Sequence, residues 1–98
     1  MIEYLYDAIK AVAGQEIKVN AYITDDEEKL INEDCYFVLY DPTGARVMAK
    51  VSGSFLTDYQ MWEFVLSAEM TEGCKGRFWY CISHNNANLN FKQPIYLM

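Results

Sequence analysis

Residues 35–52 read CYFVLYDPTGARVMAKVS, and this stretch carries the clearest structural signal in the chain. Residues 36–40 form an unbroken apolar run rich in aromatic and β-branched side chains, which is typical of a strand covered on both faces. The tetrapeptide at residues 41–44, Asp-Pro-Thr-Gly, suits a type I turn. Residues 47–51 then alternate, with Val, Ala and Val on one face. The stretch therefore predicts a β-hairpin whose first strand is central in its sheet.

The chain has the size and composition of one folded domain, residues 1–98. Its 98 residues are enough for a single hydrophobic core and too few for two. Hydrophobic residues make up 52% of the sequence and aromatic residues 15%, which supplies that core with large side chains. Because only two prolines and five glycines are present, no linker or low-complexity segment interrupts the chain.

The formal net charge is −6, whereas nucleic-acid-binding modules need a basic face that releases counterions. The lysines and arginines are spread singly, so the sequence has no polybasic patch for a membrane surface. No apolar run approaches the length of a membrane span, and the opening MIEYLYDAIK carries acids where a signal peptide needs bases. We therefore expect no nucleic-acid or membrane partner and a protein that is cytoplasmic on synthesis.

Other segments alternate with a period of two, which turns one face of each toward a core. The inward residues are Ile17, Val19, Ala21 and Ile23, then Trp62, Phe64 and Leu66, and finally Phe78, Tyr80 and Ile82, opposed by Trp79 and Cys81. A short strand is expected at residues 55–56. The last strand is expected from residue 89 to the end, with Pro94 marking an edge or a bulge.

Two segments are less regular. Residues 1–14 fit a helix and a strand almost equally; like charges at Glu3 and Asp7 disfavour the helix, while a helix stop at Gly14 is the rival interpretation. Residues 67–73 predict a single helical turn that crosses between strands, with Ser67 as N-cap and a glycine as its end.

These strands follow one another at spacings of about ten residues with turn signals between them. The pattern predicts an all-β fold, an immunoglobulin-like β-sandwich of seven or eight antiparallel strands. The three cysteines, Cys35, Cys74 and Cys81, contain no Cys-x-x-Cys pair, so we expect no disulfide scaffold. Cys35 and Cys81 fall in predicted strands and are expected to pack there as small apolar groups. The inter-sheet disulfide of antibody domains is absent because no early cysteine matches Cys81.

Catalytic and metal-binding patterns are weak. Cys35, Cys74, Cys81 and His84 are potential zinc ligands, but structural zinc sites draw their ligands as close pairs. The acidic residues 25–28 lack the spacing of a calcium loop. Ser83 adjoins His84, yet neighbouring strand residues point to opposite faces. We therefore expect no enzyme activity, no metal and no cofactor.

Exposed aromatic and loop side chains are the remaining candidates for function. Aromatic residues outside the predicted core are Tyr22, Tyr36, Tyr59, Trp79 and Tyr96. Tyr and Trp supply rigid contact area with a polar tip, although each of them also serves as a packing residue. Residues 84–88 predict a polar turn that faces solvent. The predicted binding residues are Tyr59, Trp79, His84, Asn85, Asn86 and Asn88.

Several short motifs resemble phage and prophage structural proteins, especially the immunoglobulin-like N-terminal domains of baseplate and tail-fibre upper proteins. They are residues 13–16 before an alternating strand, residues 23–26, residues 36–44, residues 62–64 and the ending at residues 91–97. The resemblance implies a non-catalytic structural or assembly protein, with virion association and with a second copy or a larger structural protein as partner. The alternative is a carbohydrate- or protein-binding sandwich that uses Trp79 and loop tyrosines.

Overall fold

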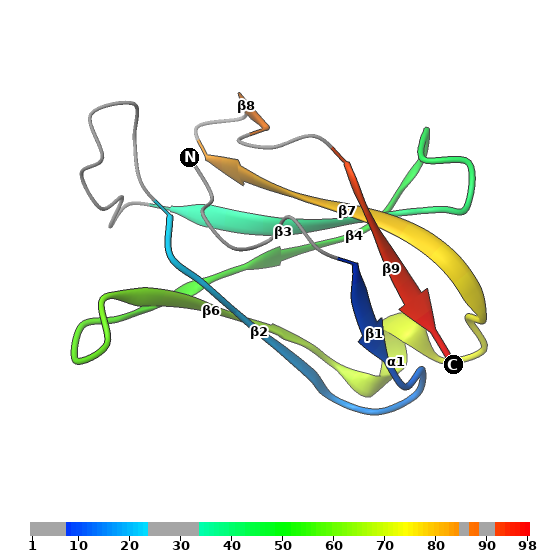
Figure 1. Cartoon of the computed structure of the whole chain (residues 1–98), viewed down its shortest axis with the longest axis horizontal. Helices are drawn as coiled ribbons and strands as arrows, with labels where there is room; N and C mark the ends of the chain where they lie inside the picture. Colours follow the sequence, from blue (N-terminus) through cyan, green and yellow to red (C-terminus); the bar gives the residue numbers. More distant parts are fainter. Residues whose placement is uncertain (1–7, 24–33, 85–86, 89–91) are drawn as a thin grey trace.

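The computed structural model describes residues 8–23, 34–84, 87–88 and 92–98, which form two facing β-sheets (Figure 1). The larger sheet runs in the order β1 (Ile9–Ala11), β9 (Gln93–Leu97), β7 (Gly76–His84), β3 (Cys35–Tyr40) and β4 (Val47–Ser52), with β8 (Ala87–Asn88) paired to β7. The smaller sheet runs in the order β2 (Ile17–Ala21), β6 (Met61–Leu66) and β5 (Ser54–Leu56). The prediction of an all-β fold is confirmed.

The hairpin of residues 35–52 is present, and β3 lies between β4 and β7 with antiparallel pairing on both sides. The connection is longer than a four-residue turn: the Gly44 N–H donates to the Asp41 carbonyl at 2.9 Å, and the Asp41 N–H donates to the Arg46 carbonyl at 2.9 Å. The Asp41 carboxylate also accepts a hydrogen bond from the Thr43 hydroxyl at 2.6 Å. That bond is the main reason why the pKa of Asp41 lies below its usual value.

One pair of strands is parallel, so the prediction of antiparallel strands throughout is wrong. In this pair β1 lies beside β9, with Ile9 opposite Ile95 and Lys10 opposite Tyr96. The two strands come from opposite ends of the chain, so no short hairpin determines their relative direction. The described residues contain nine strands rather than seven or eight, because short pieces such as β1 and β8 add to the count.

The N-terminal ambiguity is resolved in favour of a strand over Ile9–Ala11. Residues 1–7 lie outside the described residues. Gly14 does not end a helix; it has a φ of +77° in the turn that leads from β1 to β2. Pro94 pairs with Trp79 of β7 and precedes Ile95, where β9 begins to pair with β1. The N–H that proline lacks therefore leaves no gap in the hydrogen bonds between β9 and β1.

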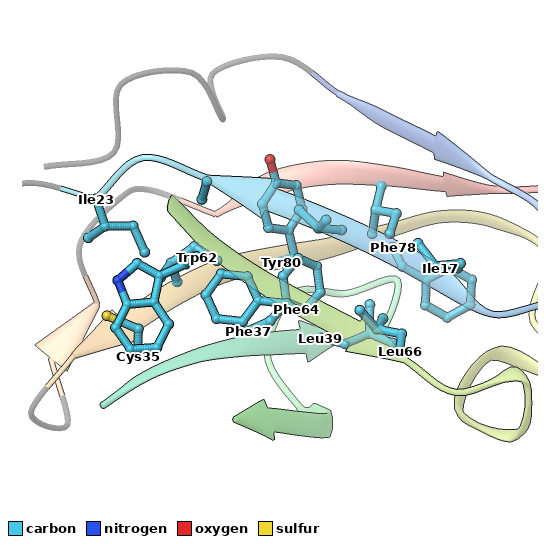
Figure 2. Packing of buried hydrophobic residues seen from close by; sticks show 14 of the residues in the cluster. Ile17, Ile23, Cys35, Phe37, Leu39, Trp62, Phe64, Leu66, Phe78 and Tyr80 are labelled. Atoms are coloured by element: carbon cyan, nitrogen blue, oxygen red, sulfur yellow. The ribbon is translucent and has the colours of Figure 1, made fainter. Parts of the chain in front are cut away.

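The core between the sheets contains every residue that the alternation predicts to point inward, and it also contains Cys35, Phe37 and Leu39 of β3 and Ile95 and Leu97 of β9 (Figure 2). Phe37 of β3 stacks on Tyr80 of β7, with ring centres 5.0 Å apart and an interplanar angle of 7°. Phe64 of the opposite sheet lies 6.1 Å from the Phe37 ring, and Trp62 lies 6.3 Å from Phe64. Burial of one such side chain contributes about 1.5–3 kcal/mol, so this aromatic stack joins the two sheets.

Gly53 allows the chain to pass from the larger sheet to the smaller one. Its N–H donates to the Cys35 carbonyl at 2.8 Å. A Cβ atom at this position would lie 2.5 Å from the Phe64 ring and 2.8 Å from the Trp62 ring. The chain can cross between β4 and β5 at this point because glycine has no side chain.

The return crossover contains α1 (Ala68–Thr71). Ser67 occupies the N-cap position as predicted, although its side chain makes no capping hydrogen bond. The turn is held at its other end, where the fully buried Thr71 hydroxyl accepts the Gly14 N–H at 3.0 Å. This bond connects the crossover to the β1–β2 turn.

Candidate binding surface

The outer face of the larger sheet carries aromatic and basic side chains in cross-strand rows. Lys10, Tyr96 and Arg77 are consecutive neighbours across β1, β9 and β7. In the next row Trp79 lies between Pro94 and Tyr40. Because residues directly opposite each other share a face, the sheet brings together side chains that are distant in sequence.

Trp79 is held in place on this face. Its indole N–H donates to the Pro42 carbonyl at 3.1 Å, and the Arg77 guanidinium lies 4.9 Å from the ring centre. The ring also packs closely on the turn, since a Cβ atom at Gly44 would approach it to 3.4 Å. Trp79 is therefore half-buried, with its polar tip engaged and its orientation determined by its neighbours.

The centre of the outer face is packed. Val38, Tyr40 and Cys81 are buried there, and the Cys81 thiol donates to the Tyr40 hydroxyl at 3.4 Å. The Lys92 ammonium lies 4.3 Å from the Tyr40 ring centre and donates to the Gly44 carbonyl. A third cation–π pair, Lys50 over Tyr36 at 4.6 Å, lies at the opposite end of β3.

The accessible part of this surface lies over β1, β9 and the start of β7. Met98 exchanges backbone hydrogen bonds with Ala11 and Ala13, which places it beside Val12. Val12 is 45% exposed and Met98 63% exposed. We call this surface the basic aromatic face; its residues are Lys10, Val12, Arg77, Trp79, Tyr96 and Met98. Among the described residues, none of the outward positions on these three strands is acidic.

The structure places His84 away from this face. It is the last residue of β7, so the prediction of a solvent-facing turn at this residue is wrong. Its Nδ1 lies 3.0 Å from the Asp34 carbonyl oxygen and 3.9 Å from Cys35 Sγ, on the core side of the sheet. Trp79 lies five residues earlier, about 17 Å away along the strand and pointing to the other face.

The other predicted binding residues are also dispersed. Tyr59 lies in the turn between β5 and β6 of the smaller sheet and is 68% exposed. Asn88 belongs to β8, where its backbone pairs with Ser83. Asn85 and Asn86 lie outside the described residues. The predicted set therefore does not form one surface through the residues that the structure describes.

The cysteines are separated by the sheet itself. Cys35 belongs to the core between the sheets, whereas Cys81 belongs to the outer cluster, and none of the three cysteines forms a disulfide. Burial raises the pKa of Cys35 to about 12, and burial also raises the pKa of Cys81. The described residues contain no group of three His, Cys, Asp or Glu side chains arranged to hold a metal ion.

An open hollow of about 600 Å³ lies beside the 41–46 turn. Its lining includes Arg46, Met48, Cys74, Lys75 and Phe78. Asp41 contributes the one carboxylate to this lining, and that carboxylate is bound within its own turn. The hollow thus offers cations and apolar surface for contact rather than an acid–base pair.

The sequence pattern predicted Trp79 as a binding residue but gave no sign that Lys10 and Arg77 lie near it, and it indicated Tyr96 only as an aromatic residue outside the core. Lys10 and Arg77 stand far apart in the sequence, and only strand pairing makes them neighbours.

No family model matches the chain, and no curated protein matches it. Within the described ranges, no helix has the length and apolar character needed to cross a membrane.

Proposed function

We propose that this chain is an immunoglobulin-like domain that acts without catalysis, as a structural or assembly protein of phage or prophage type that docks on other protein chains. The strand order supports the fold. The series β9, β7, β3 and β4 corresponds to the G-F-C-C′ sheet of variable-type domains, and β2, β6 and β5 to B-E-D. Here β1 pairs with β9 rather than completing the smaller sheet.

The observation that carries the docking proposal is the composition of the basic aromatic face. Trp, Tyr, Arg and Met are enriched in protein–protein interfaces, and Trp, Tyr and Arg dominate their binding energy. Arg77, Trp79 and Tyr96 supply three of these residue types on the adjacent strands β7 and β9, and Met98, directly after β9, supplies the fourth. Because Trp79 is already oriented by Pro42 and Arg77, little side-chain freedom is lost when a partner binds.

Carbohydrate binding is the second candidate, because Trp79 is half-buried on a sheet face and aromatic rings serve as platforms for sugars. Two observations count against it. The indole N–H is bound to Pro42, and Arg77 covers the ring, so a sugar on that side has to displace the guanidinium. Titration with oligosaccharides, followed by the NMR signal of the Trp79 indole N–H, distinguishes the candidates, since specific shifts there favour the carbohydrate module.

The structural role is tested on particles and their assembly intermediates, purified from bacteria that express the gene from its own locus. We expect the chain to co-purify with them in fixed proportion. The double variant Trp79→Ala with Tyr96→Ala should lose this association, whereas Tyr59→Ala, on the other sheet, should keep it. Absence of the unmodified chain from both particles and intermediates contradicts the proposal.

A further inference from the structure

We propose that the partner segment that docks on the basic aromatic face is an acidic stretch of another protein chain. This inference rests on the proposed docking function and adds the chemistry of the partner. Its starting point is that one part of the surface is positively charged although the chain as a whole is negatively charged. Lys10 and Arg77 on the face contribute +2, so the rest of a chain of net charge −6 carries −8.

The positive face determines which partners fit. Two copies related by a two-fold axis through this face would place Lys10 and Arg77 against cations of the same kind, which is unfavourable. A partner surface with carboxylates meets no acidic side chain on the outward positions of β1, β7 and β9. Charge complementarity therefore selects an acidic partner over a second copy placed symmetrically.

The geometry of the cations suits an extended polypeptide. Lys10 and Arg77 are separated by one strand, which carries Tyr96, so their backbones lie about 10 Å apart. Side chains on one face of an extended segment repeat at about 7 Å, and the flexible lysine accommodates the difference. Carboxylates two residues apart can therefore reach both cations.

The surrounding side chains strengthen this contact. Arg77 presents its guanidinium over the Trp79 ring, where it can form two parallel hydrogen bonds to one carboxylate. The Trp79 ring shields one side of the guanidinium from water, which strengthens the charge interaction with a bound carboxylate. Val12 and Met98 at the end of the face provide apolar contact, so the expected segment combines acidic residues with apolar ones.

Nucleic acid fits the face less well. A polyphosphate needs several cations to release its counterions, and it approaches a molecule whose net charge is −6. Base stacking also requires an open aromatic plane, whereas Arg77 covers the Trp79 ring. An oligonucleotide therefore serves as a competing probe in the test.

The test is NMR titration of the whole chain with three probes: a capped glutamate–leucine peptide, a lysine–leucine peptide of the same length, and oligothymidylate of the same charge as the glutamate peptide. We expect only the glutamate peptide to shift the signals of Lys10, Arg77, Trp79 and Tyr96, with an affinity that falls as salt rises. Arg77→Glu should weaken this binding by about tenfold or more, since close charge pairs couple strongly.

Lys18→Glu is the matched control, because it makes the same charge change on the smaller sheet, where Lys18 is paired with Glu16 at 3.8 Å. Arg77→Gln keeps the size of the side chain and should show an intermediate loss. Thermal unfolding of each variant separates loss of binding from loss of fold. The proposal is overturned if Arg77→Glu binds the peptide as Lys18→Glu does, or if oligothymidylate binds the same residues as tightly as the peptide does.

Salt-sensitive self-association that is lost in Arg77→Glu also overturns the proposal, since the occupant is then a second copy. The particle experiment keeps the two proposals separate. If co-purification depends on Trp79 and Tyr96 but is unaffected by Arg77→Glu, the docking function is supported and the acidic partner is rejected. Failure of co-purification removes the docking function itself.

Discussion

The Arg77 guanidinium lies 4.9 Å from the centre of the Trp79 indole ring, on the outer face of the larger sheet. The two residues are separated by one position on β7, so their side chains share a face and Arg77 can fold along the strand over its neighbour. The contact therefore follows from the strand and does not require a distant element. Trp79 alone receives a further restraint from the 41–46 turn, through the Pro42 carbonyl.

The Arg77–Trp79 pair should make a measurable contribution to stability. We expect a double-mutant cycle with Arg77→Ala and Trp79→Leu to give a coupling of about 0.5–1 kcal/mol, as is usual for cation–π pairs near the surface. Urea unfolding of the four proteins measures it. The same cycle between Lys18 and Trp79, which lie on different sheets, should give no coupling, and an equal value in both cycles would exclude a specific contact.

Gly53→Ala should destabilise the fold by about 1–3 kcal/mol, since the new methyl group overlaps the Phe64 and Trp62 rings at the crossing between the sheets. Chemical denaturation gives the free energy of unfolding. In a Phe64→Leu background the added cost of Gly53→Ala should be smaller, because the nearest ring is gone. If the cost is the same in both backgrounds, the steric explanation is incorrect.

Thr71→Val should lower the free energy of unfolding by about 1 kcal/mol, because the hydroxyl that accepts the Gly14 N–H is replaced by a methyl group of similar size. Thr71→Ser keeps the hydroxyl and serves as the control. Hydrogen exchange at the Gly14 amide should accelerate in the valine variant only. A valine variant more stable than the serine variant would show that the bond contributes little.

The cysteines should differ in reactivity. Cys74 is half-buried, whereas Cys35 and Cys81 are buried with raised pKa values, so alkylation of the folded protein should modify Cys74 first. Mass spectrometry after a timed reaction with iodoacetamide identifies the sites. Denaturant should expose all three thiols. Rapid modification of Cys35 in the folded chain would contradict its position in the core.

Stability should also fall at alkaline pH through Cys35. Its pKa is about 12 in the folded chain against an ordinary value of 9.0, so between these values the unfolded chain releases a proton that the folded chain retains. The stability that the protonated Cys35 thiol contributes is complete below pH 9 and is lost as the pH rises toward 12. The stability of the unmodified chain relative to Cys35→Ala should therefore decrease over this range, as pH-dependent urea unfolding can measure. A constant difference would show that the thiol does not titrate as proposed.

Local chemistry was sufficient for most elements of the fold. Strict alternation in residues 17–23, 61–66 and 78–82 predicts which side chains enter the core, and the structure buries them. The apolar run before Asp41 predicts a central strand, and β3 is flanked on both sides. These predictions succeed because the side-chain period of a strand is a local property of its backbone.

The candidate surface depends on pairing between distant segments. The sequence by itself determined the all-β class, the central hairpin and the core residues of the alternating strands, because each of them follows from neighbouring residues. Only the tertiary structure decided that β1 runs parallel to β9, that Lys10 and Arg77 flank Tyr96, and that His84 belongs to a strand. The physical reason is that strand register is established by hydrogen bonds and packing across the whole core, and a short segment contains no record of its partner.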